Sequence, residues 1–175
     1  GLTRAEIRRL QYVASVHDVG MVAVDEEILH KAGPLTDDEH EEVTQHPEQG
    51  VSLVAPLLQA PEMSQIIMTH HERVDGSGYP RGLQGLDIPL GARILAVVDA
   101  FFAMSQERPW HESRPAEHAV AELRGNAGRQ FDAEVVEAFV AVLGEEGIFA
   151  GPSAGVAAGS PVEHEREGRW QPLGS

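Results

Sequence analysis

Six side chains that can bind metal ions stand at four places along the sequence: His17-Asp18, His46, His70-His71 and Asp99. Most of them share a predicted helical face with apolar residues, where a buried polar group without a partner costs at least ~1–3 kcal/mol. A divalent cation would compensate that cost. Imidazole and carboxylate ligands together suit iron or manganese better than calcium or magnesium. The combination therefore predicts about two divalent metal sites with nitrogen and oxygen ligands.

Each place also has a simpler interpretation when it is considered alone. Asp99 shares its helical face with Leu95 and Phe102 and with no polar side chain, which favours a cation beside it unless the face is in fact exposed. His17 could be a core histidine bonded to a backbone carbonyl, with Asp18 in the last turn of the same helix. The sequence leaves both alternatives open.

The other histidines have similar alternatives. His46 precedes Pro47 and could cap a helix, and the pair His70-His71 could complement the dipole at a helix end. The remaining histidines lie in polar surroundings and are expected at the surface: His30, His40, His111, His118 and His164.

The elements that must position these residues are helical, and no alternating strand pattern appears, so we expect an all-α fold. Capping boxes at Thr3 with Glu6 and at Thr36 with Glu39 begin two helices. Helical spacing continues from the first box to Met21, with a stop near Gly20. Further helices are expected after Asp25, from Pro47, from Pro61 to His71, from Leu90 to Met104, and near 115–125 and 132–143, with Ser113 and Asp132 as caps.

Residues 72–89 have a different character, because glycine and proline recur throughout them. A loop of this length inside a domain is usually functional. From about Glu145 the chain becomes rich in glycine, proline, serine and alanine, so we expect residues 148–175 to form a disordered tail. We expect residues 1–147 to form one domain that is truncated at its N-terminus, since the sequence opens directly on a helical pattern at Gly1.

The composition excludes several classes of function. A formal net charge of −15 argues against a nucleic-acid polymer or an anionic membrane as partner. The absence of cysteine excludes disulfides, zinc-thiolate sites and thiol chemistry, and it fits a reducing compartment. No apolar run of ~18 residues and no signal peptide is present, so we expect a cytoplasmic protein without a membrane span.

Several segments carry a resemblance to a known family: His17-Asp18-Val19-Gly20, His46-Pro47-Glu48, His70-His71-Glu72-Arg73, residues 75–83, residues 88–94, Val98-Asp99-Ala100 and Gln130-Phe131-Asp132. Together they resemble the HD-GYP family over roughly residues 2–145. The double histidine followed by the Gly78-Tyr79-Pro80 loop is the most specific part of the match.

The resemblance implies an HD-superfamily helical bundle with a long GYP loop and a role in bacterial signalling. Members of the family hydrolyse cyclic di-GMP to linear pGpG and GMP with two or three divalent ions, commonly iron or manganese. Asp18 is then expected to bridge two ions and to position the attacking hydroxide, and Arg108, Arg81 and Tyr79 are expected to bind the substrate. The implied metal ligands are His17, Asp18, His46, His70, His71 and Asp99.

The resemblance also implies partners. Members use the GYP loop to bind diguanylate cyclase domains of the GGDEF type, and a covalently linked sensor or receiver domain, as in two-component systems, is expected upstream. Relatives carry further glutamate and histidine ligands on a helix that would precede Gly1.

Three positions depart from the family pattern. Met21 stands where a lysine is usual, Phe102 where an aspartate is usual, and His111 where an arginine is usual. Two apolar residues can replace a buried ion pair at little cost in stability, so we interpret Met21 and Phe102 as a coherent repacking that weakens catalysis. The alternative is a degenerate, non-catalytic module that binds metal, nucleotide or a partner. Another HD-type phosphohydrolase is disfavoured by the GYP loop.

Overall fold

The computed structural model describes residues 1–58, 60–105 and 115–148. Within these ranges the chain forms α-helices and short 3-10 helices (η) and no strand, so the predicted all-α fold is confirmed. The elements follow in the order α1 (Arg4–Val16), η1 (Val19–Ala23), α2 (Glu26–Leu29), α3 (Asp37–Thr44), α4 (His46–Val54), η2 (Ala55–Leu57), α5 (Pro61–Thr69), η3 (Gly85–Asp87), α6 (Leu90–Ser105), α7 (Ala116–Gly125) and α8 (Ala133–Glu145).

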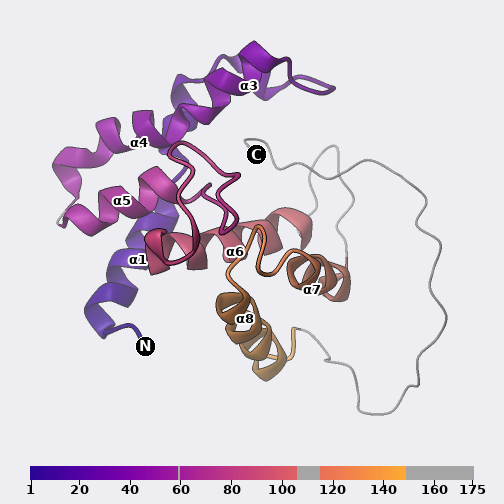
Figure 1. The fold of residues 1–175 in the computed structure, drawn as a ribbon. Coiled ribbons are helices and arrows are strands. Elements are labelled where there is room, and N and C mark those ends of the chain that lie inside the picture. Colours follow the sequence, from indigo (N-terminus) through magenta and orange to yellow (C-terminus); the bar gives the residue numbers. More distant parts are fainter. Residues whose placement is uncertain (59, 106–114, 149–175) are drawn as a thin grey trace.

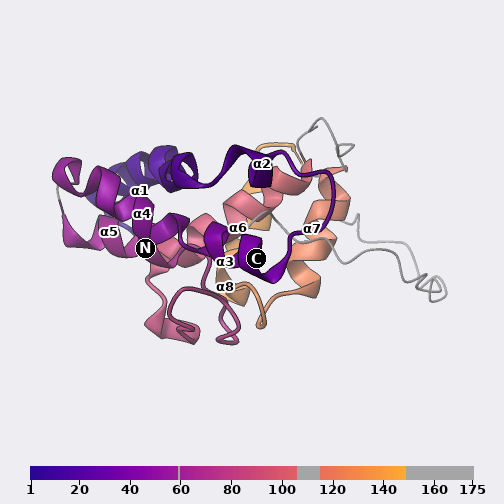
Figure 2. The same cartoon turned by 90° about the horizontal axis from the view of Figure 1, so that it is seen from above.

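Helix α6 lies between two groups of helices (Figures 1 and 2). On one side it packs with α5, which contacts α1 and α4, and on the other side it packs with α7 and α8. Leu95 joins the first apolar cluster, with Val13 of α1 and Ile67 of α5. Val97 and Phe101 join the second cluster, which α7 and α8 complete. Burial of each such side chain stabilises the fold by about 1.5–3 kcal/mol, so α6 is held from both sides.

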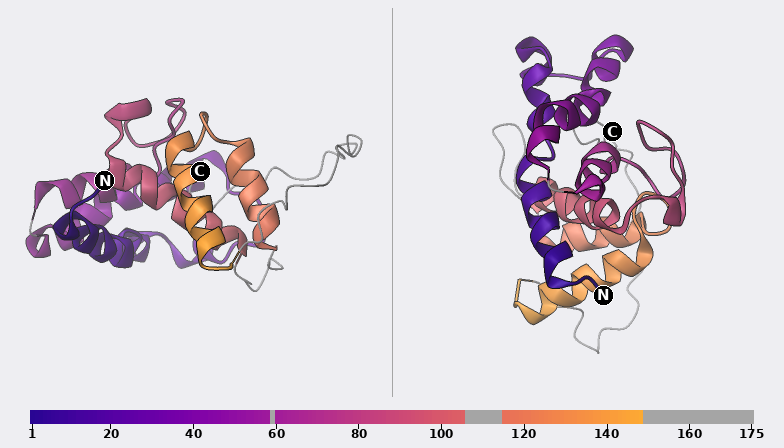
Figure 3. Two further views of the ribbon diagram at one scale, coloured as in Figure 1. Left: turned by 90° about the horizontal axis from the view of Figure 1, so that it is seen from below. Right: turned by 90° about the vertical axis from the view of Figure 1, so that its left-hand side faces the viewer.

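The helix starts agree with the capping residues in the sequence. Thr3 and Thr36 each close a capping box, and Asp132 accepts hydrogen bonds from the backbone N–H groups of Glu134 and Val135. Pro47 occupies the first turn of α4. The segment with α2 and α3 projects beyond the other helices (Figures 1 and 3). The predicted cap at Ser113 lies outside the described residues.

The first helix ends earlier than its spacing predicts. Helix α1 stops at Val16, and Met21 belongs to the 3-10 helix η1. The reason is a close approach of two backbones: a Cβ on Gly20 would lie 1.9 Å from the carbonyl oxygen of His46. Only glycine allows η1 to rest directly on α4, and the chain must leave the α-helix to reach that contact.

The glycine-rich segment between α5 and α6 is an ordered loop that stands beside the helices (Figure 3). The carboxylate of Glu72, only 4% exposed, accepts hydrogen bonds from the backbone N–H groups of Arg81 (2.7 Å) and Leu83 (3.0 Å). A Cβ on Gly78 would lie 2.4 Å from the backbone nitrogen of Arg73, so the loop rests directly on its own N-terminal part. The Tyr79–Pro80 peptide bond is cis. Among the described residues, no helix combines the length and apolarity needed to cross a membrane.

Candidate metal centre

Three histidines are oriented in the same way by the ends of three helices. Nδ1 of His17 lies 2.9 Å from the carbonyl oxygen of Ala14, Nδ1 of His46 lies 2.8 Å from that of Val43, and Nδ1 of His70 lies 2.6 Å from that of Ile67. In each case the carbonyl belongs to the residue three positions earlier. Because a carbonyl only accepts, Nδ1 carries the proton, and in the neutral ring the lone pair of Nε2 is free to bind a metal.

The Nε2 atoms converge on one carboxylate. Oδ1 of Asp18 lies 3.5 Å from Nε2 of His46 and 3.4 Å from Nε2 of His70. Nε2 of His46 in turn lies 3.4 Å from Nε2 of His70 and 3.2 Å from Nε2 of His71. Each of these four residues offers a ligand atom, and the four atoms lie within 4.8 Å of one another. The four side chains form the first ligand set.

The second oxygen of Asp18 faces a different pair of side chains. Oδ2 lies 3.2 Å from Nε2 of His17, and that nitrogen lies 3.9 Å from Oδ1 of Asp99 on α6. We call His17, Asp18 and Asp99 the second ligand set. Asp18 belongs to both sets, because its two oxygens point to different partners.

The spacing of these atoms fits a metal ion better than direct hydrogen bonds. Ligands at about 2.1 Å from one ion in tetrahedral or octahedral geometry lie about 3.0–3.4 Å apart. The contacts of the first set span 3.2–3.5 Å. Nε2 of His17 is buried and has no hydrogen-bond partner among the described residues. Three imidazole nitrogens that face one another across such distances cannot all carry protons, so a shared cation satisfies them best.

The electrostatics agree with this interpretation. Burial, reinforced by the neighbouring His70 and His46, holds the pKa of His71 well below its usual range, so this imidazole is neutral near pH 7. Burial alone would raise the pKa of Asp18, but contacts with His17, His46 and His70 hold it far below its usual range. The centre therefore combines an ionised carboxylate with a neutral imidazole, and both are the forms that metal ions bind.

Two glycines bring Asp18 and His46 together. Gly20 of η1 and Gly50 of α4 face each other, and a Cβ on Gly50 would lie 3.3 Å from the backbone nitrogen of Gly20. This contact places Asp18, just before η1, against His46 at the start of α4. His17 is the C-cap of α1 and Asp18 is the N-cap of η1, so the two neighbours lie at the junction of two helices, where Nε2 of His17 is 3.2 Å from Oδ2 of Asp18.

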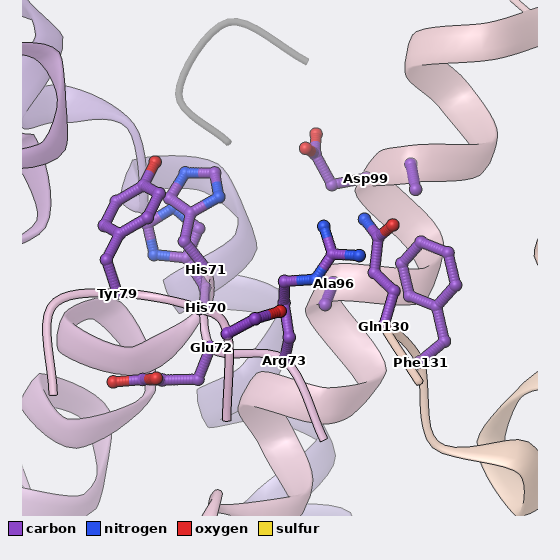
Figure 4. A pocket seen from close by; sticks show the side chains of 12 residues that line it. His70, His71, Glu72, Arg73, Tyr79, Ala96, Asp99, Gln130 and Phe131 are labelled. Carbon is purple, nitrogen blue, oxygen red and sulfur yellow. The ribbon is translucent and has the colours of Figure 1, made fainter. Parts of the chain in front are cut away.

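A cavity extends from the centre between α6 and the glycine-rich loop (Figure 4). Tyr79 stacks on His71 with ring centroids 4.9 Å apart, and its buried hydroxyl has no hydrogen-bond partner among the described residues. Burial, together with the charges of Asp18 and Asp99, raises the pKa of this phenol, so it stays protonated and can donate. Asp99, Arg73 and Gln130 line the same cavity.

The structure thus brings together all six predicted ligands and places Tyr79 beside them. That these residues bind metal stays a prediction. Arg81 is exposed, and it is not among the residues that line the cavity. Arg108 and His111 lie outside the described residues. Glu72, Arg73, Gln130 and Gly20 stand in the motifs but were assigned no role from the sequence. Only the glycine within His17-Asp18-Val19-Gly20 offered a signal, since glycine often marks a close backbone approach.

The expected repacking of Met21 with Phe102 is wrong for Phe102. This side chain is 47% exposed, and its ring makes an edge contact with Phe101, with centroids 5.7 Å apart. The physical reason is the position of α6. The buried faces of this helix contribute side chains to both apolar clusters. Phe102 and the half-exposed Asp99 lie outside those faces.

Similarity to known proteins supports the assignment of the fold and the family. The sequence profile of the HD domain matches residues 1–135. A cyclic di-GMP phosphodiesterase of Thermotoga maritima is 40% identical over 144 residues, which are 80% of this chain and 39% of the relative. The cyclic di-GMP phosphodiesterase response regulator RpfG of Xanthomonas campestris is 40% identical over 80% of this chain and 38% of its own length. A 3'3'-cGAMP-specific phosphodiesterase of Vibrio cholerae is 38% identical over 78% of this chain and 27% of its own length.

A solved structure shares the fold. It is a cyclic GMP-AMP-specific phosphodiesterase of V. cholerae that superposes with a TM-score of 0.64 at 18% identity, covering 84% of this chain and 40% of that protein. The present chain therefore spans between about a quarter and two fifths of the length of these relatives. The chain belongs to the HD domain family, and the resemblance of its sequence to the HD-GYP members is confirmed.

Proposed function

We propose that this domain is a metal-dependent phosphodiesterase that hydrolyses a cyclic dinucleotide, cyclic di-GMP in the first place, to linear pGpG and GMP. The single observation that carries the proposal is Asp18, whose two oxygens face two ligand sets 3.2–3.5 Å away. A shared carboxylate is the arrangement that two-metal phosphohydrolases need. Sequence relatives that are named for this activity support the choice of substrate.

The residues of this chain would divide the work as follows. His46, His70 and His71 with Asp18 hold one divalent ion, and His17 and Asp99 with Asp18 hold the other, iron or manganese in both cases. When bound, the two ions supply Lewis acidity toward the phosphate and lower the pKa of a water molecule. The protonated hydroxyl of Tyr79 is placed to donate to a phosphate oxygen in the cavity. The glycine-rich loop, held by Glu72, forms one wall of the cavity through Ser77, Gly78 and Tyr79.

A non-catalytic role is the second candidate, and a specific observation favours it. Met21 and the exposed Phe102 leave the centre without the lysine and aspartate that the resemblance leads us to expect. The loss of a phosphate-binding cation or a general acid typically lowers a rate by about 10²–10⁴. The domain would then bind metal or nucleotide and turn over slowly or not at all.

The signalling context is part of the proposal. An upstream sensor or receiver domain would control the centre, and a diguanylate cyclase of the GGDEF type would bind the GYP loop. The loop offers a surface for such a partner, because Leu86 in η3 is 84% exposed and Arg81 is exposed as well.

The test is a turnover assay with controlled metal loading. The purified protein is loaded with Mn²⁺, or with Fe²⁺ without oxygen, its metal content is measured, and it is incubated with cyclic di-GMP. Chromatography should detect pGpG and GMP. A fully loaded protein that binds cyclic di-GMP but releases no product would establish the non-catalytic alternative. A protein that takes up no iron, manganese or zinc would contradict both candidates.

A further inference from the structure

Two side chains from distant parts of the sequence meet in the wall of the cavity. The segment after α5 and the loop before α8 are joined by backbone hydrogen bonds, from Val74 N–H to the carbonyl of Gln130 (3.3 Å) and from Asp75 N–H to the carbonyl of Arg129 (2.9 Å). This pairing brings Arg73 and Gln130 side by side. Figure 4 shows the guanidinium of Arg73 and the amide of Gln130 directed toward the same space, below Asp99.

The guanidinium of Arg73 has no strong partner within the described residues. Its Nε is buried without a hydrogen bond, and the nearest carboxylate oxygen, on Asp75, is 4.0 Å away and already accepts from the N–H and hydroxyl of Ser77. Other arginines behave differently. Arg124 makes two hydrogen bonds to Glu137 (2.9 and 2.8 Å), and Arg93 binds Asp132. A buried donor without a partner is destabilising, so a ligand that accepts a hydrogen bond from Arg73 would compensate it.

The side chain of Gln130, like that of Arg73, has polar groups that are available to a ligand. Its backbone groups are used in the loop pairing, whereas its side-chain amide makes no hydrogen bond within the described part of the chain. Beside it, Ala96, Ala100 and the buried Phe131 give the cavity an apolar wall. An apolar slot with one guanidinium and one amide suits a planar, hydrogen-bonding ligand better than a bare anion.

We infer that this part of the cavity is a guanine subsite, in which Arg73 reads the O6 and N7 edge of the base and Gln130 contacts the same base. This inference rests on the proposed function and names the base of the dinucleotide that the cavity recognises. The two parallel N–H donors of an arginine match the two acceptors of guanine. Adenine presents an N6 amino group where guanine has O6. This donor would face an N–H donor of Arg73, and no hydrogen bond could form.

A phosphate contact is the competing role for the same arginine, and the two roles predict different behaviour. A phosphate contact contributes equally for every nucleotide. A base contact contributes only for guanine. Lysine retains the charge of arginine but not its fork, so Arg73→Lys should spare much of a phosphate contact and remove base discrimination.

The experiment measures binding of GMP and AMP to the manganese-loaded protein by titration calorimetry. The wild-type protein should bind GMP about tenfold or more tightly than AMP, because one bidentate pair discriminates by roughly that factor. Arg73→Lys should reduce the ratio toward one by weakening GMP binding alone. The control is Arg129→Lys, a neighbouring exposed arginine that does not line the cavity, and it should retain the ratio.

A modified ligand keeps the inference testable even if the Arg73 variant does not fold. 7-deaza-GMP lacks the N7 acceptor and should bind the wild-type protein about tenfold more weakly than GMP. Equal binding of GMP and AMP by the wild type, equal binding of GMP and 7-deaza-GMP, or an equal loss of GMP and AMP binding in Arg73→Lys would overturn the guanine subsite.

A parallel turnover assay with cyclic di-GMP separates this inference from the proposed function. Hydrolysis with no Arg73-dependent preference for GMP would reject the subsite and leave the phosphodiesterase standing. A preference for GMP that depends on Arg73, in a protein that releases no product, would support the subsite and reject the catalytic role.

Discussion

Oδ1 of Asp18 lies 3.5 Å from Nε2 of His46, although 28 positions separate the two residues, because Gly20 and Gly50 let their backbones touch. The candidate metal centre therefore depends on a backbone contact between two glycines, neither of which is a candidate ligand. Any side chain at Gly20 must push η1 away from α4 and separate the two ligands.

Gly20→Ala should accordingly damage both the fold and the centre. Its Cβ would lie 1.9 Å from the carbonyl oxygen of His46, and overpacking of this kind costs at least about 1–3 kcal/mol. We expect a lower midpoint of urea unfolding and weaker Mn²⁺ binding. Gly144→Ala in α8 is the matched control, because a Cβ there meets nothing within 4 Å, and it should not lower stability. Wild-type manganese affinity in Gly20→Ala would show that the contact does not position Asp18.

The two ligand sets should be separable by mutation. Asp18→Asn removes the carboxylate that both sets share, so metal analysis after gel filtration should find the bound manganese or iron strongly reduced at both sites. Asp99→Asn alters only the second set and should leave the metal content of the first set unchanged. Asp37→Asn, on exposed α3, is the control and should retain the full content. Equal metal loss in the Asp18 and Asp99 variants would contradict the division into two sets.

The sequence pointed to the candidate ligands because histidine and aspartate are recognisable residue by residue, and the structure brings these side chains together. A histidine among apolar side chains is costly unless it is paired, and that held for the buried His46 and His70, whereas the side chain of Asp99 is 40% exposed. The helix caps at Thr3, Thr36 and Asp132 could also be predicted from the sequence, because an N-cap is a local interaction between a side chain and the next turn.

What the sequence could not show depends on contacts between distant segments. The end of α1 at Val16 is set by the packing of Gly20 on His46, and no local sequence pattern predicts this end. Glu72 reads as an ordinary charged loop residue, yet its carboxylate is buried because two backbone N–H groups of the same loop satisfy it. The meeting of Arg73 with Gln130 follows from backbone pairing across more than fifty residues.

Glu72 leads to a prediction about the glycine-rich loop. In Glu72→Gln one carboxylate oxygen becomes an amide donor that would face a backbone N–H, and an unsatisfied buried donor costs about 1–3 kcal/mol. Hydrogen exchange at the amides of Arg81 and Leu83 should become faster, while the exposed control Glu62→Gln on α5 should leave it unchanged. Unchanged exchange in Glu72→Gln would mean that other contacts hold the loop.

Met21 and Phe102 lead to a prediction about rate. The double variant Met21→Lys with Phe102→Asp should raise the turnover of cyclic di-GMP by about 10² or more, if the two missing polar groups limit it. Phe102 is 47% exposed, so an aspartate there is readily solvated. Val142→Lys, at a similarly exposed apolar position on α8, is the control and should not change the rate. A folded, metal-loaded double variant that turns over no faster than the wild type would show that these positions do not account for the rate.

The ion pair between Arg93 and Asp132 should give stability a specific dependence on pH. Burial alone would raise the pKa of Asp132, but the hydrogen bond from Arg93 and those from the backbone N–H groups at the start of α8 lower it. Its folded pKa therefore lies below the unfolded value of about 4. The contribution of the ionised Asp132 carboxylate to the free energy of unfolding is complete above the unfolded pKa. It is lost as the pH falls through the folded pKa. Asp132→Asn keeps a good cap for α8 but loses the charge.

The free energy of unfolding of the wild-type protein should therefore exceed that of Asp132→Asn at pH 7, and the two should converge as the pH is lowered from about 5 toward 2. Urea unfolding at a series of pH values measures the difference. Asp37→Asn serves as the control, because Asp37 is exposed at the start of α3. A constant difference between the wild type and Asp132→Asn across the whole range would show that the carboxylate acts only as a cap, and not through its charge on Arg93.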